Sequence, residues 1–155
     1  MALVKGTNSY VTVAEADSYF AERLHSETWS GASPTDKEKA LITATSLLDQ
    51  KPWVGEAEDE LQPLAFPRIG YYYDPKYGRD LDLIDTPERV VKATYELALH
   101  LLSNDVMAAS STVKSLSVGP ISLQQISTSK EPSKLDELIS PLLENSGSLS
   151  WWRAN

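Results

Sequence analysis

The chain has 155 residues, no cysteine and a formal net charge of −8, from 14 basic and 22 acidic residues. Its length predicts one domain that can bury a sizeable core, and the lack of cysteine excludes disulfides, thiolate catalysis and thiolate zinc sites. The acidic balance disfavours tight binding to a phosphate backbone, which needs clustered Lys and Arg.

Neither a signal peptide nor a membrane span is expected. The first ten residues lack the apolar core of a signal peptide. No apolar run approaches the roughly 18–20 residues that a membrane helix needs. We therefore expect a protein that is made in the cytosol and has no membrane partner.

A first helix is predicted directly after Thr12. Thr12 and Glu15 have the spacing of a capping box, in which each side chain bonds the backbone amide of the other residue. Hydrophobic periodicity gives this helix a length of about 12 residues. Its apolar face is expected to comprise Val13, Ala16, Phe20 and Leu24. Residues 26–32 are expected to form a loop that holds Trp29.

A second helix is predicted to start at Pro34. Ser33 is a favoured N-cap residue, and Pro34 suits the first helical position because its missing amide proton is not needed there. The helix should run to about Asp49, since Pro52 lies just beyond it. Its apolar stripe is formed by Ala40, Leu41, Ala44, Leu47 and Leu48.

Residues 51–85 show no long hydrophobic period, yet they hold four prolines, three glycines and six aromatic residues. Loops of this length inside a compact domain are uncommon and usually functional. Disordered linkers are poor in aromatic residues. We therefore expect an ordered excursion that is held in place by Trp53, Leu64 and Phe66, with its tip at residues 71–80.

The clearest helical pattern follows Thr86 and Pro87, which repeat the pairing of an N-cap residue with Pro at the first helical position. The helix should run to about Leu102. Its apolar face comprises Val90, Val91, Thr94, Leu97, Ala98, Leu101 and Leu102. A face this broad predicts the central helix of the core.

A β-hairpin is predicted near residues 113–127. Hydrophobic residues alternate with polar ones on both sides of Gly119 and Pro120. These residues are Leu116, Val118, Ile121 and Leu123. Two strands alone are marginal in water, so the hairpin must pack on the helices or pair with another chain.

A last helix is predicted over residues 133–144, where Pro141 should kink or split it. The fold class is therefore mainly α: a small bundle of about four helices, with the ordered loop at 51–85 and the hairpin near 113–127.

Residues 1–144 are expected to form a single domain, followed by a C-terminal tail at residues 145–155. The tail holds Trp151, Trp152 and Arg153. Two exposed indoles at a chain end need something to cover them. We interpret the tail as a docking segment, with packing onto its own domain as the alternative.

Catalysis is not expected. The two histidines, His25 and His100, have no second histidine at ligand spacing, and no phosphate-binding, nucleophile or zinc-protease motif is present. We therefore predict a protein without enzymatic activity, cofactor or metal.

An acidic cluster at Asp80, Asp82 and Asp85, with Asp74 upstream, could supply oxygen ligands to calcium. Its spacing does not match a calcium-binding loop of the helix–loop–helix type. We favour a solvated loop whose negative charge leads into the helix at Pro87, where the helix dipole is favourable.

The tip of the excursion carries the clearest candidate for a binding surface. Its tyrosines could stack on bases while its cations hold phosphates. Tyr, Trp and Arg are also enriched in protein interfaces, and we favour protein contact because the chain is acidic. The predicted contact residues are Trp53, Phe66, Arg68, Tyr71, Tyr72, Tyr73, Tyr77, Leu116, Val118, Ile121, Leu123, Trp151, Trp152 and Arg153.

Several motifs of the chain resemble those of one protein family, and they occur in the same order. The run GTNSYVTVAEADSYF at residues 6–20 resembles the opening of small tailed-phage proteins that are often labelled DnaT-like single-stranded-DNA-binding proteins. The further matches are Trp29, KALITATSLLD at 39–49, QPLAFPR at 62–68, the helix at 90–102 with its ELAL motif, and residues 115–121. The resemblance covers residues 6 to 145.

This family resembles the head–tail adaptor, or connector, proteins of the phage neck. The resemblance implies a structural virion protein, made in the host cytoplasm, of which about twelve copies form a ring under the portal, as closed symmetric assemblies do. The implied partners are the portal protein, neighbouring copies and a downstream tail or nozzle protein. Genomic double-stranded DNA would pass through the lumen without sequence-specific binding. The alternative is a replication accessory protein that binds single-stranded DNA.

Overall fold

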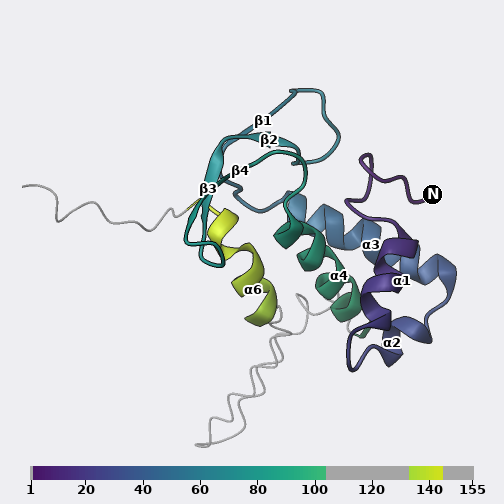
Figure 1. Ribbon diagram of the computed structural model, residues 1–155. Coiled ribbons are helices and arrows are strands. Elements are labelled where there is room, and N and C mark those ends of the chain that lie inside the picture. Colours follow the sequence, from purple (N-terminus) through teal and green to yellow (C-terminus); the bar gives the residue numbers. More distant parts are fainter. Residues whose placement is uncertain (1, 104–132, 145–155) are drawn as a thin grey trace, which may run out of the picture.

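The computed structural model describes residues 2–103 and 133–144 as a mainly α domain with two small antiparallel hairpins (Figure 1). The helices are α1 (Val13–Ala21), α2 (Glu27–Ser30), α3 (Pro34–Asp49), α4 (Glu88–Ser103), α6 (Ser133–Ile139) and the 3-10 helix η1 (Ser140–Leu142). The strands are β1 (Glu56–Ala57), β2 (Arg68–Ile69), β3 (Tyr71–Asp74) and β4 (Arg79–Asp82). The predicted fold class is confirmed.

Helix α1 begins at the predicted capping box: the amide of Glu15 donates to Thr12 Oγ1 at 3.2 Å, and the amide of Thr12 donates to Glu15 Oε2 at 2.7 Å. The helix is shorter than predicted, and Leu24 lies beyond its end with 82% of its surface exposed. The chain turns there through His25, whose φ is +59°. The assignment of Leu24 to the apolar face was therefore wrong.

Residues 26–32, which were expected to form a loop, contain the short helix α2. Its Trp29 is buried, packs its ring 4.8 Å from that of Phe20, and donates from Nε1 to Asp17 at 2.8 Å. Helix α3 then begins at Pro34 and ends at Asp49, as predicted, with the side chain of Ser33 accepting from the amide of Asp36.

Helix α4 is the centre of the bundle, as its broad apolar face predicted. It packs against α2, α3 and α6 (Figure 1). Its buried residues are Val90, Ala93, Thr94, Tyr95, Glu96, Leu97 and Ala98. A helix covered on nearly all sides belongs to the interior of a bundle, and one buried residue here, Glu96, is charged.

Pro141 splits the last helix, as predicted: α6 ends at Ile139 and the tighter turn η1 follows. Leu142 is buried, and its carbonyl accepts the amide of Val54 at 2.9 Å. The amide of Glu144 donates to the carbonyl of Pro52 at 2.8 Å. The last described residues therefore hold the start of the 51–85 excursion against the bundle.

The excursion is ordered and forms two hairpins, β1–β2 and β3–β4. Trp53, Leu64 and Phe66 are buried, which confirms their predicted role in holding it. The indole of Trp53 lies edge-on to Phe66 with ring centroids 5.2 Å apart and donates to the carbonyl of Leu48 at 2.8 Å. The strands were not predicted, because segments of two and four residues are too short to display a period of two.

Gly55 permits the close approach of the backbone before β1 to the end of β2. Its φ is +77°, and a Cβ on it would lie 2.4 Å from the carbonyl oxygen of Ile69. We expect Gly55→Ala to destabilise the chain by about 3 kcal/mol, because the substitution combines an unfavourable φ with a backbone clash. Gly78→Ala is the matched control: φ is +63°, but the nearest atom, the Tyr73 hydroxyl, is 3.9 Å away.

The control should cost about 1 kcal/mol, the penalty for the left-handed conformation alone. Urea unfolding followed by circular dichroism measures both changes. Equal destabilisation by the two substitutions would contradict the proposed role of close packing at Gly55.

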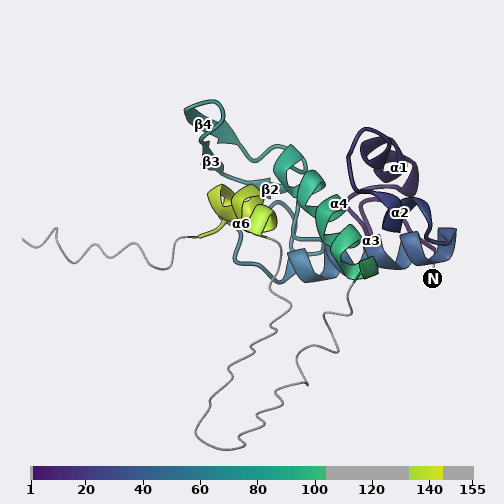
Figure 2. The ribbon, with the colours of Figure 1, turned by 90° about the horizontal axis from the view of Figure 1, so that it is seen from below.

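The β3–β4 hairpin lies at the opposite end of the described domain from α1 and α2, as both views of the ribbon show (Figures 1 and 2). Over residues 2–103 and 133–144, none of the helices combines the length and apolar character needed to cross a membrane. The hairpin predicted near residues 113–127 and the tail at 145–155 lie outside the described residues.

Candidate contact surface

The β3–β4 hairpin has an inner and an outer face. Tyr72 and Asp74 are buried on the inner face, whereas Tyr71 and Tyr73 point outward and are 71% and 57% exposed. In the antiparallel register, Tyr71 is paired with Asp82 and Tyr73 with Asp80. Directly opposite residues project from the same face of a sheet. The outer hairpin face is therefore composed of two tyrosines and two aspartates: Tyr71, Tyr73, Asp80 and Asp82.

Asp74 anchors the inner face to α4 through a bidentate pair with Arg89. Arg89 Nε donates to Asp74 Oδ2 at 2.9 Å, and Arg89 Nη2 donates to Asp74 Oδ1 at 2.7 Å. The Tyr72 hydroxyl and the Lys76 amide donate to the same carboxylate at 3.1 and 2.8 Å. The hydrogen bonds from Arg89 outweigh burial and hold the pKa of Asp74 far below its usual range. Arg89 also reaches the carbonyl of Leu138 in α6 at 3.4 Å.

The turn between β3 and β4 closes on the same residue. The backbone carbonyl of Asp74 accepts from the amides of Tyr77 at 3.2 Å and Gly78 at 2.8 Å. Lys76 Nζ lies 5.0 Å from the ring centroid of the half-exposed Tyr77. The tip of the hairpin thus presents a tyrosine with a cation beside it, in contrast to the acidic outer face.

A shallow hollow of about 300 Å³ continues the surface from Asp82 towards β2. It is lined in part by two exposed isoleucines, Ile69 and Ile84, and by the carboxylates of Glu58 and Asp85. Apolar side chains surrounded by carboxylates thus extend the character of the outer hairpin face.

The structure separates the predicted contact residues into groups. Trp53, Phe66 and Tyr72 are buried within the chain, which removes them from the predicted contact surface. Tyr71 and Tyr73, together with Tyr77, are exposed, and their contact role stays a prediction. The remaining candidates that lie outside the described residues are Leu116, Val118, Ile121, Leu123, Trp151, Trp152 and Arg153.

Arg68 was also predicted to make contacts, but its guanidinium group is occupied by the backbone of the excursion. It donates to the carbonyls of Val54 at 2.9 Å and Gly55 at 2.6 Å, with longer bonds to Trp53 and Ala65. These bonds satisfy carbonyls of a segment that has little regular structure. Arg68 therefore organises the loop from inside.

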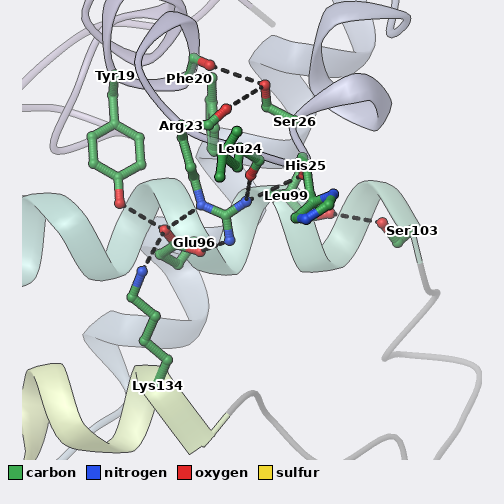
Figure 3. Close-up of polar contacts among 10 residues, drawn as sticks. All are labelled: Tyr19, Phe20, Arg23, Leu24, His25, Ser26, Glu96, Leu99, Ser103 and Lys134. Atoms are coloured by element: carbon green, nitrogen blue, oxygen red, sulfur yellow. Dashed lines mark hydrogen bonds and ion pairs between the residues drawn. The ribbon is translucent and has the colours of Figure 1, made fainter.

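A second buried carboxylate, Glu96 of α4, joins three helices (Figure 3). Arg23, just beyond α1, donates to it twice, from Nε to Oε1 and from Nη2 to Oε2, both at 2.8 Å. The Tyr19 hydroxyl donates to Oε1 at 2.6 Å, and Lys134 of α6 approaches the same oxygen at 3.4 Å. Burial raises the pKa of Glu96, but the bonds from Arg23 and Tyr19 outweigh it and hold the pKa below its usual value.

A third carboxylate, Asp49 at the end of α3, accepts the hydroxyl of Tyr10 and the amide of Ala65 at 3.1 Å. Burial, followed by the bond to Asp49, raises the pKa of Tyr10 well above its usual range. Asp49 thereby holds both the N-terminal segment and the excursion. Asp74 and Glu96 accept hydrogen bonds on both carboxylate oxygens, whereas the bonds to Asp49 both go to Oδ1.

Sequence reasoning did not single out Asp49 or Glu96, and it named Asp74 only as a neighbour of the acidic cluster at residues 80–85. For Glu96 a signal exists: the residue is an acid set in the apolar pattern of α4, between Tyr95 and Leu97. A charge at such a position is tolerated only when it is paired. The partners themselves, however, are distant in sequence.

Within residues 2–103 and 133–144, no group of three or more His, Asp or Glu side chains is arranged to hold a metal ion. His25 is exposed. His100 has a buried Nε2 without a hydrogen-bond partner, and no carboxylate bond orients either ring among the described residues.

Comparison with known proteins gives one result. A family model described as "Putative DnaT-like ssDNA binding protein" matches residues 2–154 of the chain. Neither the curated proteins nor the solved structures contain a match. Because the family model spans nearly the whole sequence, the chain belongs to the DnaT-like family that this description names.

Proposed function

We propose that this chain is a structural protein that acts through contacts with other proteins, as a head–tail adaptor subunit of a tailed phage. In this role about twelve copies form a closed ring under the portal. The ring joins the capsid to the tail, and genomic DNA passes through its lumen. The observation that carries the proposal is the outer hairpin face, a rigidly held, exposed surface of tyrosines and carboxylates.

The charges of this face argue for a protein partner over a nucleic acid. Asp80 and Asp82 lie directly opposite the two exposed tyrosines, where they would repel a phosphate backbone. Residues 51–85 hold eight acidic and four basic residues, so half of the net charge of −8 lies in the excursion. Surfaces that bind single-stranded DNA combine aromatic platforms with a cationic groove. Here the aromatic platform is present without that groove.

The rigidity of the hairpin also supports a contact role. The Asp74–Arg89 pair and the turn bonds hold the backbone of the hairpin from which Tyr71 and Tyr73 project. Preorganised aromatic side chains lose little conformational entropy on binding. Exposed tyrosines of this kind are frequent at the centres of protein interfaces.

Single-stranded-DNA binding is the second candidate function. The family description names it, and Tyr77 with Lys76 and Arg79 offers a small aromatic and cationic tip. The family comparison favours this second function, whereas the charges of the outer hairpin face favour the first.

Binding to the cognate portal ring tests the first function. The purified chain, mixed with portal, is expected to add a ring of density under the portal in electron micrographs. Tyr71→Ser with Tyr73→Ser should reduce this binding at least tenfold, because exposed aromatic contacts are lost without loss of folding. The control is Leu24→Ser, at an apolar residue beyond α1 that is 82% exposed. Helix α1 lies at the other end of the domain from the β3–β4 hairpin (Figure 1).

An oligonucleotide assay tests the second function. We expect oligothymidine to bind more weakly than about 100 μM at physiological salt, the weak limit of non-specific binding. Micromolar binding with a steep salt dependence, abolished by Lys76→Glu and Arg79→Glu, would instead establish the second function. Absence of portal binding at every salt concentration would overturn the first.

A further inference from the structure

Among the residues that the structure describes, the exposed large apolar side chains are concentrated in one segment. Of the eight large hydrophobic residues that are exposed within the described parts of the chain, five lie between residues 69 and 84. They are Ile69, Tyr71, Tyr73, Tyr77 and Ile84. Apolar side chains scattered singly need no explanation, but a concentration of this kind marks a contact surface.

The groups beside these side chains favour a partner that carries positive charge. Asp80 and Asp82 stand opposite Tyr73 and Tyr71, and neither carboxylate has an ion-pair partner among the described residues. Tyrosine rings attract cations through their negative faces. Carboxylates attract cations directly, with guanidinium groups binding in a bidentate manner. Both components of the outer hairpin face therefore favour the same kind of ligand.

The spacing of the two tyrosine–aspartate pairs selects the conformation of the partner. Tyr71 and Tyr73 are separated by one residue of β3, as Asp82 and Asp80 are in β4. Successive side chains on one face of a strand lie roughly 7 Å apart. An extended chain presents its own alternate residues at the same interval, so two of its side chains can meet the two pairs together.

We propose that the outer hairpin face binds an extended segment of a partner protein that carries arginine at alternate positions. Each guanidinium group stacks on one tyrosine ring and pairs with the aspartate opposite it. Arginine is preferred to lysine because its planar group can stack and form a bidentate pair at once. The proposal rests on the contact function above and assigns the chemistry of the partner segment.

A synthetic peptide tests the chemistry without the portal. The probe is an acetylated and amidated octapeptide with arginine and serine alternating, and the comparison peptide has glutamate in place of arginine. Binding is measured by isothermal titration calorimetry at 50 and 300 mM salt. The arginine peptide is expected to bind, the glutamate peptide not, and the affinity should fall as salt rises.

Matched variants locate the site. Asp80→Asn with Asp82→Asn is expected to weaken peptide binding at least tenfold, as is Tyr71→Ser with Tyr73→Ser. Glu22→Gln with Glu60→Gln removes the same charge from exposed positions elsewhere and should change the affinity less than twofold. Equal weakening by both carboxylate pairs would overturn the proposal, since it would show general attraction to an acidic protein.

The portal experiment keeps this inference distinguishable from the proposed function. If Tyr71→Ser with Tyr73→Ser abolishes portal binding while Asp80→Asn with Asp82→Asn leaves it unchanged, the contact function stands and the arginine segment is overturned. If the chain does not bind portal at all but the peptide results hold, the adaptor function fails and the chemistry of the face stands.

Discussion

Replacing Glu96 by alanine is expected to destabilise the folded chain by about 3 kcal/mol, towards the lower limit for breaking a buried ion pair. Glu96 is only 6% exposed and receives three short hydrogen bonds from Arg23 and Tyr19. Its removal leaves the guanidinium group and the hydroxyl without their acceptor. Because Arg23 is partly exposed, water can replace some of the lost bonds, which keeps the cost below the upper limit of that range. Urea unfolding at pH 7 measures the change.

Glu96→Gln is the matched control for shape. The amide keeps one acceptor oxygen for the donors but loses the charge, so we expect about half of the destabilisation caused by alanine. Glu88→Ala, which removes an exposed carboxylate from the first turn of the same helix, should cost less than about 1 kcal/mol. A cost for Glu96→Ala as small as that of Glu88→Ala would contradict the role of Glu96 in joining α1, α4 and α6.

The parts of the fold that were predicted correctly depend on local signals. The capping box at Thr12 and Glu15, the helix start at Ser33 and Pro34, and the split at Pro141 each involve residues within one turn of each other. Such signals act through steric and hydrogen-bonding rules that do not depend on the rest of the chain. They therefore survive in the folded structure without modification.

The parts that were missed depend on contacts between distant residues. Arg23 and Glu96 are 73 residues apart in sequence, and Tyr10 and Asp49 are 39 apart. The position of Leu24 was predicted wrongly because periodicity continued the helix past Ala21, whereas Arg23 turns away to reach α4 and to bond the carbonyls of Leu24 and His25. Tertiary bonds overrode the local pattern.

The candidate contact surface was likewise predictable in its composition but not in its arrangement. The aromatic character of residues 71–80 was visible in the sequence. Which tyrosines are exposed, and which carboxylates stand opposite them, depends on the strand register, since a shift by one residue would exchange the two faces. The buried side chain of Asp74 selects that register, because its pair with Arg89 requires Tyr72 and Asp74 to face the bundle.

Asp74→Asn is therefore expected to destabilise the chain by about 3 kcal/mol and to release the hairpin from α4. The substitution removes the charge that Arg89 pairs with and turns an amide donor towards the guanidinium group. Amide hydrogen exchange over residues 71–82 should accelerate more than exchange in α3. Arg89→Lys keeps the cation but loses the bidentate geometry, so it should have an intermediate effect.

The same pair predicts how the effect depends on pH. The pKa of Asp74 is lower in the folded chain than in the unfolded chain, where it is about 3.9. The stabilisation is therefore fully present above that value and is lost as the pH falls towards the folded pKa. The difference in unfolding free energy between the wild-type chain and Asp74→Asn should therefore begin to shrink as the pH falls below about 4 and should keep shrinking down to pH 2.

Binding measurements with Asp74→Asn would show whether partner binding depends only on the residues of the outer hairpin face or also on how the hairpin is held. The variant keeps Tyr71, Tyr73, Asp80 and Asp82, so all the groups that would touch a partner remain. If Asp74 preorganises the hairpin for binding, the affinity of the variant for portal or for the arginine peptide should fall, although no contact residue has changed. Unchanged affinity together with accelerated exchange would mean that the partner itself orders the hairpin, and the rigid anchoring at Arg89 would then serve stability alone.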